Sequence, residues 1–167
     1  LAIPIRSILR SRSQHRSASS AIMPSLVACM ALVSAFYHLP PRVLPSIHAV
    51  EGGRPGLVSV NTNGSSDLGV MQINTLWVAP LARRTGLPEP IVRDRLINDA
   101  CFNIATAGAI VRLHLNEENG DLLRAVGAYH SRTPARSEAY QSKVLSAAQQ
   151  LFVVPASPLR TKHQSQR

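Results

Sequence analysis

Glu51 is the residue whose type and surroundings most clearly point to chemistry. Leu44 and Ile47 lie seven and four residues before it, so the three side chains share one face of a helix. Gly52 and Gly53 follow directly, and glycine readily adopts the left-handed conformation that ends helices. The pattern predicts a half-buried carboxyl near a helix C-terminus, where burial and the helix dipole both raise its pKa. A raised pKa suits a general acid working near neutral pH, although a glutamate before a glycine is more often an ordinary exposed residue.

A second stretch with chemical groups follows this helix. Residues 54–74 are rich in turn signals, and residues 57–60 fit a short strand. We expect a loop or small hairpin here, which is a natural place for groups that contact a substrate. Asp67 is a candidate second carboxylate, but it can equally brace the turn before Gly69. If Asp67 faced Glu51 across room for a water molecule, hydrolysis of a substrate would become feasible.

The net charge of +9 is concentrated at the two ends of the chain. The first 22 residues hold four arginines, the residues after Phe152 hold three basic residues, and neither end has an acidic residue. The stretch between them has eleven basic and nine acidic residues, a balance of only +2, and no expected helix carries a dense basic stripe. We therefore do not expect nucleic-acid binding.

The chain has two cysteines, Cys29 and Cys101. Two are too few for a zinc site without histidines at ligand spacing, and the sequence shows none, so we expect neither a metal nor another cofactor. From the residues alone, the pair fits a disulfide across a long loop and two separate buried thiols about equally well. A disulfide would require an oxidising compartment.

The first 37 residues admit two interpretations. Residues 1–20 are polar and arginine-rich, and we interpret them as disordered. Residues 21–37 are apolar and uncharged, which is the layout of a secretory signal, and residues 26–29 resemble a lipoprotein cleavage box. The alternative, which we favour, is a core helix, and it leaves the export signal atypical or incomplete. Its inward side would be formed by Val27, Met30, Ala31, Ser34 and Ala35. The run is short and interrupted by Pro24, so no stable membrane span is expected.

The rest of the chain is expected to be helical, because capping residues, glycines and prolines punctuate apolar runs. The expected helices run from Asn74 or Thr75 to about Arg84, from Pro88 to about Ile97, from Asp99 to about Asn119, from Asp121 to Tyr129, and from Pro134 to before Pro155. The inward residues of the third of these helices are expected to be Phe102, Ala105, Ala109, Ile110 and Leu113. Those of the last are expected to be Tyr140, Val144, Ala147, Ala148 and Leu151.

Several of these stretches, taken together, resemble one known family. In chain order they are Glu51-Gly52-Gly53, Gly69-Val70-Met71-Gln72-Ile73-Asn74, Cys101-Phe102-Asn103-Ile104, Ala128-Tyr129-His130 and Tyr140. They resemble the soluble lytic transglycosylase domain, which has the goose-type lysozyme fold, and most of all its small members associated with bacterial secretion systems and pili. The resemblance implies an α+β, predominantly α, lysozyme-like domain over residues 25–152, with a small β-hairpin or loop region. Residues 1–24 would then be a disordered or export-related tail, and residues 153–167 a flexible basic tail.

The resemblance also implies a substrate and a reaction. The substrate is the glycan strand of peptidoglycan, cut between N-acetylmuramic acid and N-acetylglucosamine without water, so that a 1,6-anhydro end remains. Because the nucleophile is a hydroxyl of the same sugar, the substrate supplies it at high effective concentration. One carboxyl group can therefore act first as acid and then as base, whereas an ordinary glycosidase needs two. Glu51 matches the family's catalytic glutamate and takes both roles.

Other positions match substrate-binding residues of the family, and the full set is Gln72, Met71, Asn74, Tyr129, His130 and Tyr140. An amide at Gln72 can donate to and accept from sugar substituents, and the hydroxyl of Tyr129 can reach Glu51 or the reacting sugar. Met71 and Tyr140 are nearly as well explained by packing in the core. Asn103 matches an asparagine that we expect to hold structure rather than substrate.

Two departures from the family pattern concern the positioning of Glu51. The usual serine after the glutamate is Gly52 here, so a hydroxyl that can orient the acid is missing. The usual asparagine after the tyrosine is His130, which could equally be a surface or capping histidine.

The resemblance also favours a bridge between Cys29 and Cys101, because small members of the family carry a pair at these positions. A bridge favours the periplasm. The partners implied are peptidoglycan strands and components of a secretion or pilus apparatus, for which the protein would open the wall locally. The alternatives are a hydrolytic lysozyme of the same fold, a non-catalytic assembly factor that binds glycan, and an inert product without an export signal.

Overall fold

The structure is a computed structural model that describes residues 25–152. The tails and export segment expected on residues 1–24 and 153–167 lie outside these residues. The elements in chain order are α2 (Leu26–Phe36), α3 (Val43–Glu51), β1 (Val58–Val60), β2 (Ser66–Leu68), β3 (Ile73–Asn74), the short 3-10 helix η2 (Thr75–Trp77), α4 (Val78–Thr85), α5 (Glu89–Asn98), α6 (Ala100–Glu117), α7 (Leu122–His130) and α8 (Pro134–Phe152).

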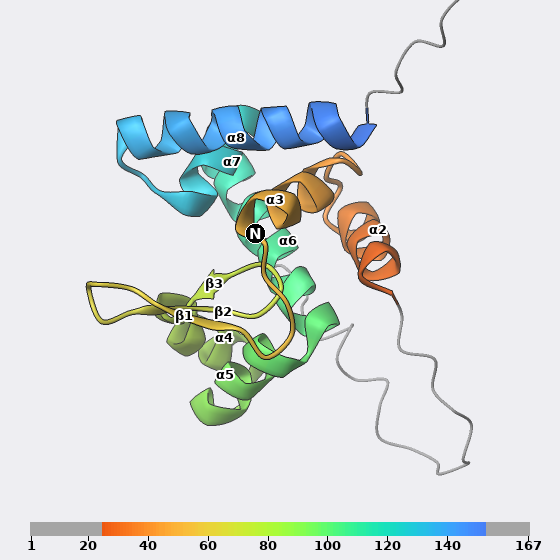
Figure 1. Cartoon of the computed structure of the whole chain (residues 1–167). Coiled ribbons are helices and arrows are strands. Elements are labelled where there is room, and N and C mark those ends of the chain that lie inside the picture. The colour runs from red at the N-terminus through yellow and green to blue at the C-terminus, as the bar shows by residue number, and fades with distance from the viewer. Residues whose placement is uncertain (1–24, 153–167) are drawn as a thin grey trace, which may run out of the picture.

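Helix α6 forms the centre of this arrangement, with the sheet, α4 and α5 toward one end and α3, α7 and α8 toward the other (Figure 1). Asp99 begins it as expected, because its side chain accepts a hydrogen bond from the backbone N–H of Phe102. The buried face predicted for α6 was too narrow. Ile104, Ala107 and Val111 are fully buried, while Ala105, Ala109 and Leu113 are only half-buried. A helix surrounded by others has no polar face, so its periodicity does not reveal which side meets the core.

Helix α2 is a core helix, as favoured, but it is turned relative to the prediction. Cys29, Met30 and Val33 are buried, whereas Val27 is 74% exposed and Ala31 is also exposed. The reason is a close contact with α6. A Cβ added to Gly108 would lie 2.4 Å from Val33 Cγ1, so only glycine lets the two helices approach this closely.

The disulfide expected between Cys29 and Cys101 is present and joins α2 to the start of α6, with a Cα–Cα distance of 5.5 Å.

The region between α3 and α4 forms a small antiparallel sheet in the order β1-β2-β3. Ser59 pairs with Asp67, and Asp67 pairs in turn with Asn74, so these three polar residues cross the sheet in one row. The hairpin expected here is therefore confirmed, with a third strand added. Asn74 rather than Thr75 caps the helical segment that follows, because its side chain accepts from the backbone N–H of Leu76 at 3.0 Å.

Helix α8 packs across α7 and α3. Tyr140 and Val144 are buried, as predicted, but Ala147 and Ala148 are only half-buried and Leu151 is 52% exposed. The prediction extended the inward face too far, because the last turns of this 19-residue helix lie mostly exposed beyond the part that is packed.

The predominantly helical α+β fold class is confirmed. Within residues 25–152, no single helix is both long and apolar enough to cross a membrane, although α5 and α6 would meet the criteria of length and composition jointly, across a bend of 103°.

Candidate active site

Glu51 is the last residue of α3, as predicted. Leu44 and Ile47 of the same helix are fully buried, Glu51 itself is half-buried, and Gly52 ends the helix in the left-handed conformation at φ 62°. Burial is the main reason that the pKa of Glu51 is raised above its ordinary value of 4.5. A hydrogen bond from Tyr140 lowers this pKa, and the nearby charge of Asp67 raises it further. The carboxyl group therefore holds its proton to higher pH than an exposed glutamate would.

The end of α3 lies directly against the Gly69-Val70 backbone. A Cβ added to Gly53 would be 2.3 Å from the carbonyl oxygen of Gly69 and 2.4 Å from that of Val70, so no larger residue fits without a backbone shift. His48, one turn before Glu51, also fixes the backbone just after α3, because its Nε2 lies 3.1 Å from the carbonyl oxygen of Gly53 and can donate to it. These contacts bring together two of the five stretches on which the family resemblance rests, Glu51-Gly52-Gly53 and the block that begins at Gly69.

Tyr140 reaches Glu51 from the opposite side. Its hydroxyl donates to Glu51 Oε1 at 2.5 Å, although the two residues are 89 positions apart. Only 4% of Tyr140 is exposed, and burial together with the charge of Glu51 raises the pKa of its phenol well above 10. The hydroxyl therefore remains a donor at any physiological pH. The imidazole of His130 lies flat against the same phenol ring, with ring centroids 4.6 Å apart and an interplanar angle of 1°.

The polar row of the sheet is occupied by its own hydrogen bonds. Asp67 accepts from Asn74 Nδ2 at 2.8 Å and from Asn61 Nδ2 at 2.9 Å. The amide of Asn74 also donates to Ser65 Oγ at 3.0 Å, while its oxygen caps η2. Asn74, expected to bind substrate, is thus placed as a brace for Asp67 and for the start of η2. Asn61 was not anticipated, because nothing in its local sequence indicates a partner across the hairpin.

Gln72 is also held by the protein. It adopts φ 48°, its Nε2 donates to the Gly69 carbonyl at 2.8 Å, and its Oε1 accepts from the hydroxyl of Ser59 at 2.7 Å. Met71, its neighbour, is fully buried, which agrees with the packing alternative. The two bonds to Gly69 and Ser59 fix the amide of Gln72 in one orientation.

Tyr129 takes a different partner from the one expected. Its hydroxyl donates to the backbone carbonyl of Met71 at 2.7 Å rather than to Glu51. The charge of Glu51 still contributes to the raised pKa of Tyr129, after burial as the larger cause, so the two groups lie near each other. Tyr129 thus fixes the backbone beside the acid.

Asn103 of α6 has the structural role expected for it. Its Nδ2 donates to the carbonyls of Leu68 and Leu96, and its Oδ1 accepts from the backbone N–H of Met71 at 2.8 Å. A Cβ added to Gly69 would lie 2.1 Å from the Leu96 carbonyl oxygen, which explains the glycine at that position. This buried asparagine therefore joins the sheet region to α5 and α6.

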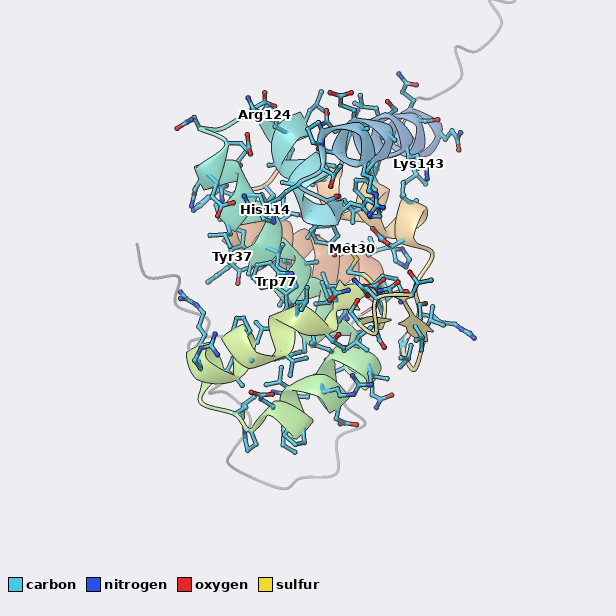
Figure 2. All side chains as sticks on the ribbon, turned by 90° about the vertical axis from the view of Figure 1, so that its left-hand side faces the viewer. Met30, Tyr37, Trp77, His114, Arg124 and Lys143 are labelled. Carbon is cyan, nitrogen blue, oxygen red and sulfur yellow. A yellow bond between two sulfur atoms is a disulfide. The ribbon has the colours of Figure 1, made fainter. Side chains whose placement is uncertain are left out.

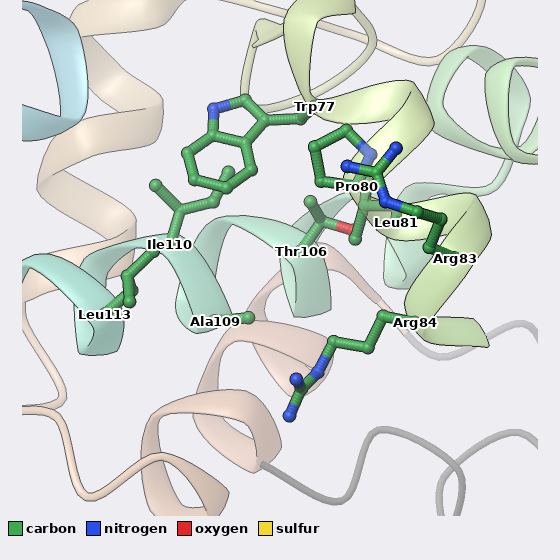
Figure 3. A pocket seen from close by; sticks show the side chains of 9 residues that line it. All are labelled: Trp77, Pro80, Leu81, Arg83, Arg84, Thr106, Ala109, Ile110 and Leu113. Atoms are coloured by element: carbon green, nitrogen blue, oxygen red, sulfur yellow. The ribbon is translucent and has the colours of Figure 1, made fainter. Parts of the chain in front are cut away.

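A separate hollow of about 400 Å³ lies between α4 and α6 (Figure 3). Trp77, which lines it, packs edge-on against His114 with ring centroids 6.4 Å apart, and Figure 2 shows both residues near the middle of its view. The lining is apolar apart from Thr106 and two arginines and has no carboxylate. The residues that line this hollow therefore include no acid.

A half-buried glutamate at the end of a core helix, facing a three-stranded sheet in a mainly helical domain, defines a lysozyme-like class of protein. Comparison with known families agrees, because the Transglycosylase SLT domain matches residues 29–150. The chain belongs to this family, and the resemblance drawn from its residues is confirmed.

Two curated relatives are similar over much of the chain. The Invasion protein IagB of Salmonella typhimurium is 30% identical over 112 residues, which cover 66% of this chain and 66% of that protein. The Protein IpgF of Shigella flexneri is 34% identical over 106 residues, which cover 61% of this chain and 64% of that protein. The chain thus matches just under two thirds of the length of each.

Proposed function

We propose that this protein is a peptidoglycan lytic transglycosylase. It would cleave the bond between N-acetylmuramic acid and N-acetylglucosamine and leave a 1,6-anhydro end, with Glu51 as the single acid and base. The observation that carries the proposal is the half-buried carboxyl of Glu51, whose pKa is raised mainly by burial and whose Oε1 is held by Tyr140 at 2.5 Å. Membership of the family supports the substrate.

The chemistry follows from this arrangement. Protonated Glu51 gives its proton to the glycosidic oxygen as the bond breaks, and the leaving sugar departs as an alcohol. The carboxylate that remains accepts the proton of the attacking 6-hydroxyl, so the acid is regenerated. Tyr140 stabilises the intermediate carboxylate, because its hydrogen bond favours the charged form of Glu51. No water and no second carboxylate are consumed by this sequence of steps.

The test is a product analysis by mass spectrometry. Purified peptidoglycan is digested with the full chain, with Glu51→Gln, and with Glu89→Gln as a matched control at an exposed glutamate on α5. We expect wild type and Glu89→Gln to release fragments with anhydro ends, each one water lighter than a reducing end. Glu51→Gln keeps the shape of the side chain but has no proton to transfer. It should therefore release no fragments, with either anhydro or reducing ends.

A hydrolytic lysozyme of the same fold is the second candidate, and Asp67 is the observation in its favour. Its charge is close enough to raise the pKa of Glu51, and Asn61 and Asn74 hold both of its oxygens. A second carboxylate of this kind could assist a water molecule. Reducing ends in place of anhydro ends, lost on Asp67→Asn, would establish hydrolysis. Anhydro ends that persist in Asp67→Asn would exclude a role for Asp67 as nucleophile or base.

We further propose that the protein acts in the periplasm and opens the wall locally for a secretion or pilus apparatus. The Cys29–Cys101 disulfide supports an oxidising compartment. One relative's description as an invasion protein is in keeping with such an apparatus. In this proposal residues 25–152 are the catalytic domain, and residues 1–24 and 153–167 are tails. Fractionation of the native protein tests the compartment, and cleavage by residues 25–152 alone tests the domain limits.

A further inference from the structure

His130 contacts Tyr140, the side chain whose hydroxyl donates a hydrogen bond to the proposed acid. It is the last residue of α7 and is exposed, whereas its stacking partner Tyr140 lies in α8 and is 4% exposed. The two rings are parallel within 1° at a centroid distance of 4.6 Å, and the phenol then donates to Glu51 at 2.5 Å. The contacts form a chain from the surface to the acid, with His130 outside, Tyr140 in the middle and Glu51 at the end.

A stacked ring constrains what a tyrosine can do. The hydroxyl of Tyr140 reaches Glu51 Oε1 because the whole phenol ring lies where it does, and a parallel aromatic ring against one face opposes displacement of the phenol toward that side. The family's usual asparagine at this position has no ring to stack, so this constraint comes with the histidine. Charged groups around His130 come from two elements. Partial burial of the imidazole is the main cause of the lowered pKa of His130; Lys143 and Arg136 of α8 lower this pKa further, and Asp67 of β2 opposes them.

We propose that His130 is a positioning residue whose imidazole holds the ring of Tyr140, so that the phenol hydroxyl stays on Glu51. The role is one of shape, which means that a neutral aromatic ring should replace it and a small side chain should not. The inference builds on Glu51 as the proposed acid, but its first readout is independent of activity.

That readout is the pKa of Glu51, measured by carboxyl NMR titration of the full chain. The hydrogen bond from Tyr140 lowers this pKa, so Tyr140→Phe should raise it. We expect His130→Ala to raise it part of the way, in the same direction. We expect His130→Phe to leave it unchanged. His130→Ala should have no further effect in the Tyr140→Phe background, because a residue that acts through the hydroxyl has nothing left to act on.

The second readout is turnover of peptidoglycan fragments. His130→Ala should lower kcat about fivefold, because it weakens the hydrogen bond from Tyr140 without removing it, with KM changed by less than about twofold. His130→Phe should restore kcat to within about twofold of wild type. Leu123→Ala, an exposed change on the same helix α7, is the matched control and should match wild type in both readouts.

The inference is overturned if His130→Ala leaves the pKa of Glu51 unchanged or lowers it, if the double variant shows additive shifts, or if His130→Phe behaves like His130→Ala. Failure of the proposed function looks different. In that case wild type yields no cleavage or only reducing ends, while the titration still decides whether His130 positions Tyr140. Unfolding curves identify any variant whose change reflects loss of fold.

Discussion

The end of α3 and the nearby sheet both carry polar side chains, but these side chains differ in how completely their hydrogen bonds are satisfied. In the sheet, the side chains of Asp67, Gln72 and Asn74 all have their hydrogen bonds satisfied by neighbours within the region. At the end of α3, Glu51 is half-buried and has an unfavourably raised pKa, with Tyr140 as its support. The hydrogen bonds of the sheet region hold its side chains in place, whereas the raised pKa of Glu51 leaves a carboxyl group that can give up a proton near neutral pH. The contrast predicts that changes in the scaffold reduce stability, while changes around Glu51 reduce activity with little loss of stability.

The largest effect on stability is expected from Asn103→Ala. The change leaves two buried carbonyls, of Leu68 and Leu96, and the N–H of Met71 without their partner. We expect the free energy of unfolding to fall by about 3 kcal/mol or more, measured by urea denaturation. Asn98→Ala, an exposed asparagine on α5, is the control and should change it by less than about 0.5 kcal/mol. Equal effects of the two changes would contradict a scaffold role for Asn103.

Gly53→Ala tests the junction between the two regions. Its Cβ would lie 2.3 Å from the Gly69 carbonyl oxygen, so the end of α3 must move away from the sheet. We expect a loss of about 2 kcal/mol in unfolding free energy together with a loss of cleavage, because the carboxyl of Glu51 is displaced. Gly56→Ala is the comparison: it has open space at φ 82°, so it should cost only about 1 kcal/mol from the backbone conformation and keep activity.

Tyr140→Phe should separate activity from stability. Removal of the hydroxyl takes away one charge-assisted hydrogen bond to Glu51, and kcat should fall roughly tenfold, while unfolding free energy changes by about 1 kcal/mol or less. Tyr37→Phe, at another buried tyrosine just after α2, should leave kcat unchanged. A Tyr140→Phe variant with full activity would show that the contact to Glu51 is only structural.

The smallest effect concerns the pH dependence of stability. The pKa of Glu51 is raised in the folded state, so the folded state binds more protons than the unfolded state between about pH 4.5 and the folded-state pKa. Stability from this group is therefore complete below about pH 4.5 and declines as pH rises through the folded-state pKa. Glu51→Gln should remove the decline and be at least as stable as wild type at pH 7, as measured by thermal unfolding. A clearly destabilised Glu51→Gln would mean that the ionised carboxylate of Glu51 stabilises the fold, which contradicts a raised pKa.

The sequence predicted local features well. Periodicity and glycine placed Glu51 at the end of a helix, and the capping rules found Asp99 and Asp121 because each acts on a backbone N–H within three residues. They left Asn74 and Thr75 as alternatives, and the structure shows that Asn74 is the cap. The sequence predicted the buried faces of α2 and α6 less well. Gly108 allows those two helices to approach closely, but a glycine in a sequence does not indicate which residues will pack against it.

Contacts between distant residues could not be derived from spacing. The hydroxyl of Tyr129 binds a backbone carbonyl 58 positions away, and Tyr140 reaches Glu51 across 89 positions. The family resemblance pointed to both tyrosines, but only the structure shows which of them contacts the acid. The hydrogen bond from Asn61 was not predicted, because its partner Asp67 lies across the hairpin turn and no local pattern marks the pair.

The most direct test of the account is the mass of the glycan ends released from peptidoglycan by wild type and by Glu51→Gln under identical conditions. The account predicts anhydro-ended fragments from wild type and no fragments from the variant, whose fold stays intact by unfolding measurements. Fragments of unchanged kind and amount from Glu51→Gln would show that the proton comes from another group, and the central role given to this carboxyl would be wrong.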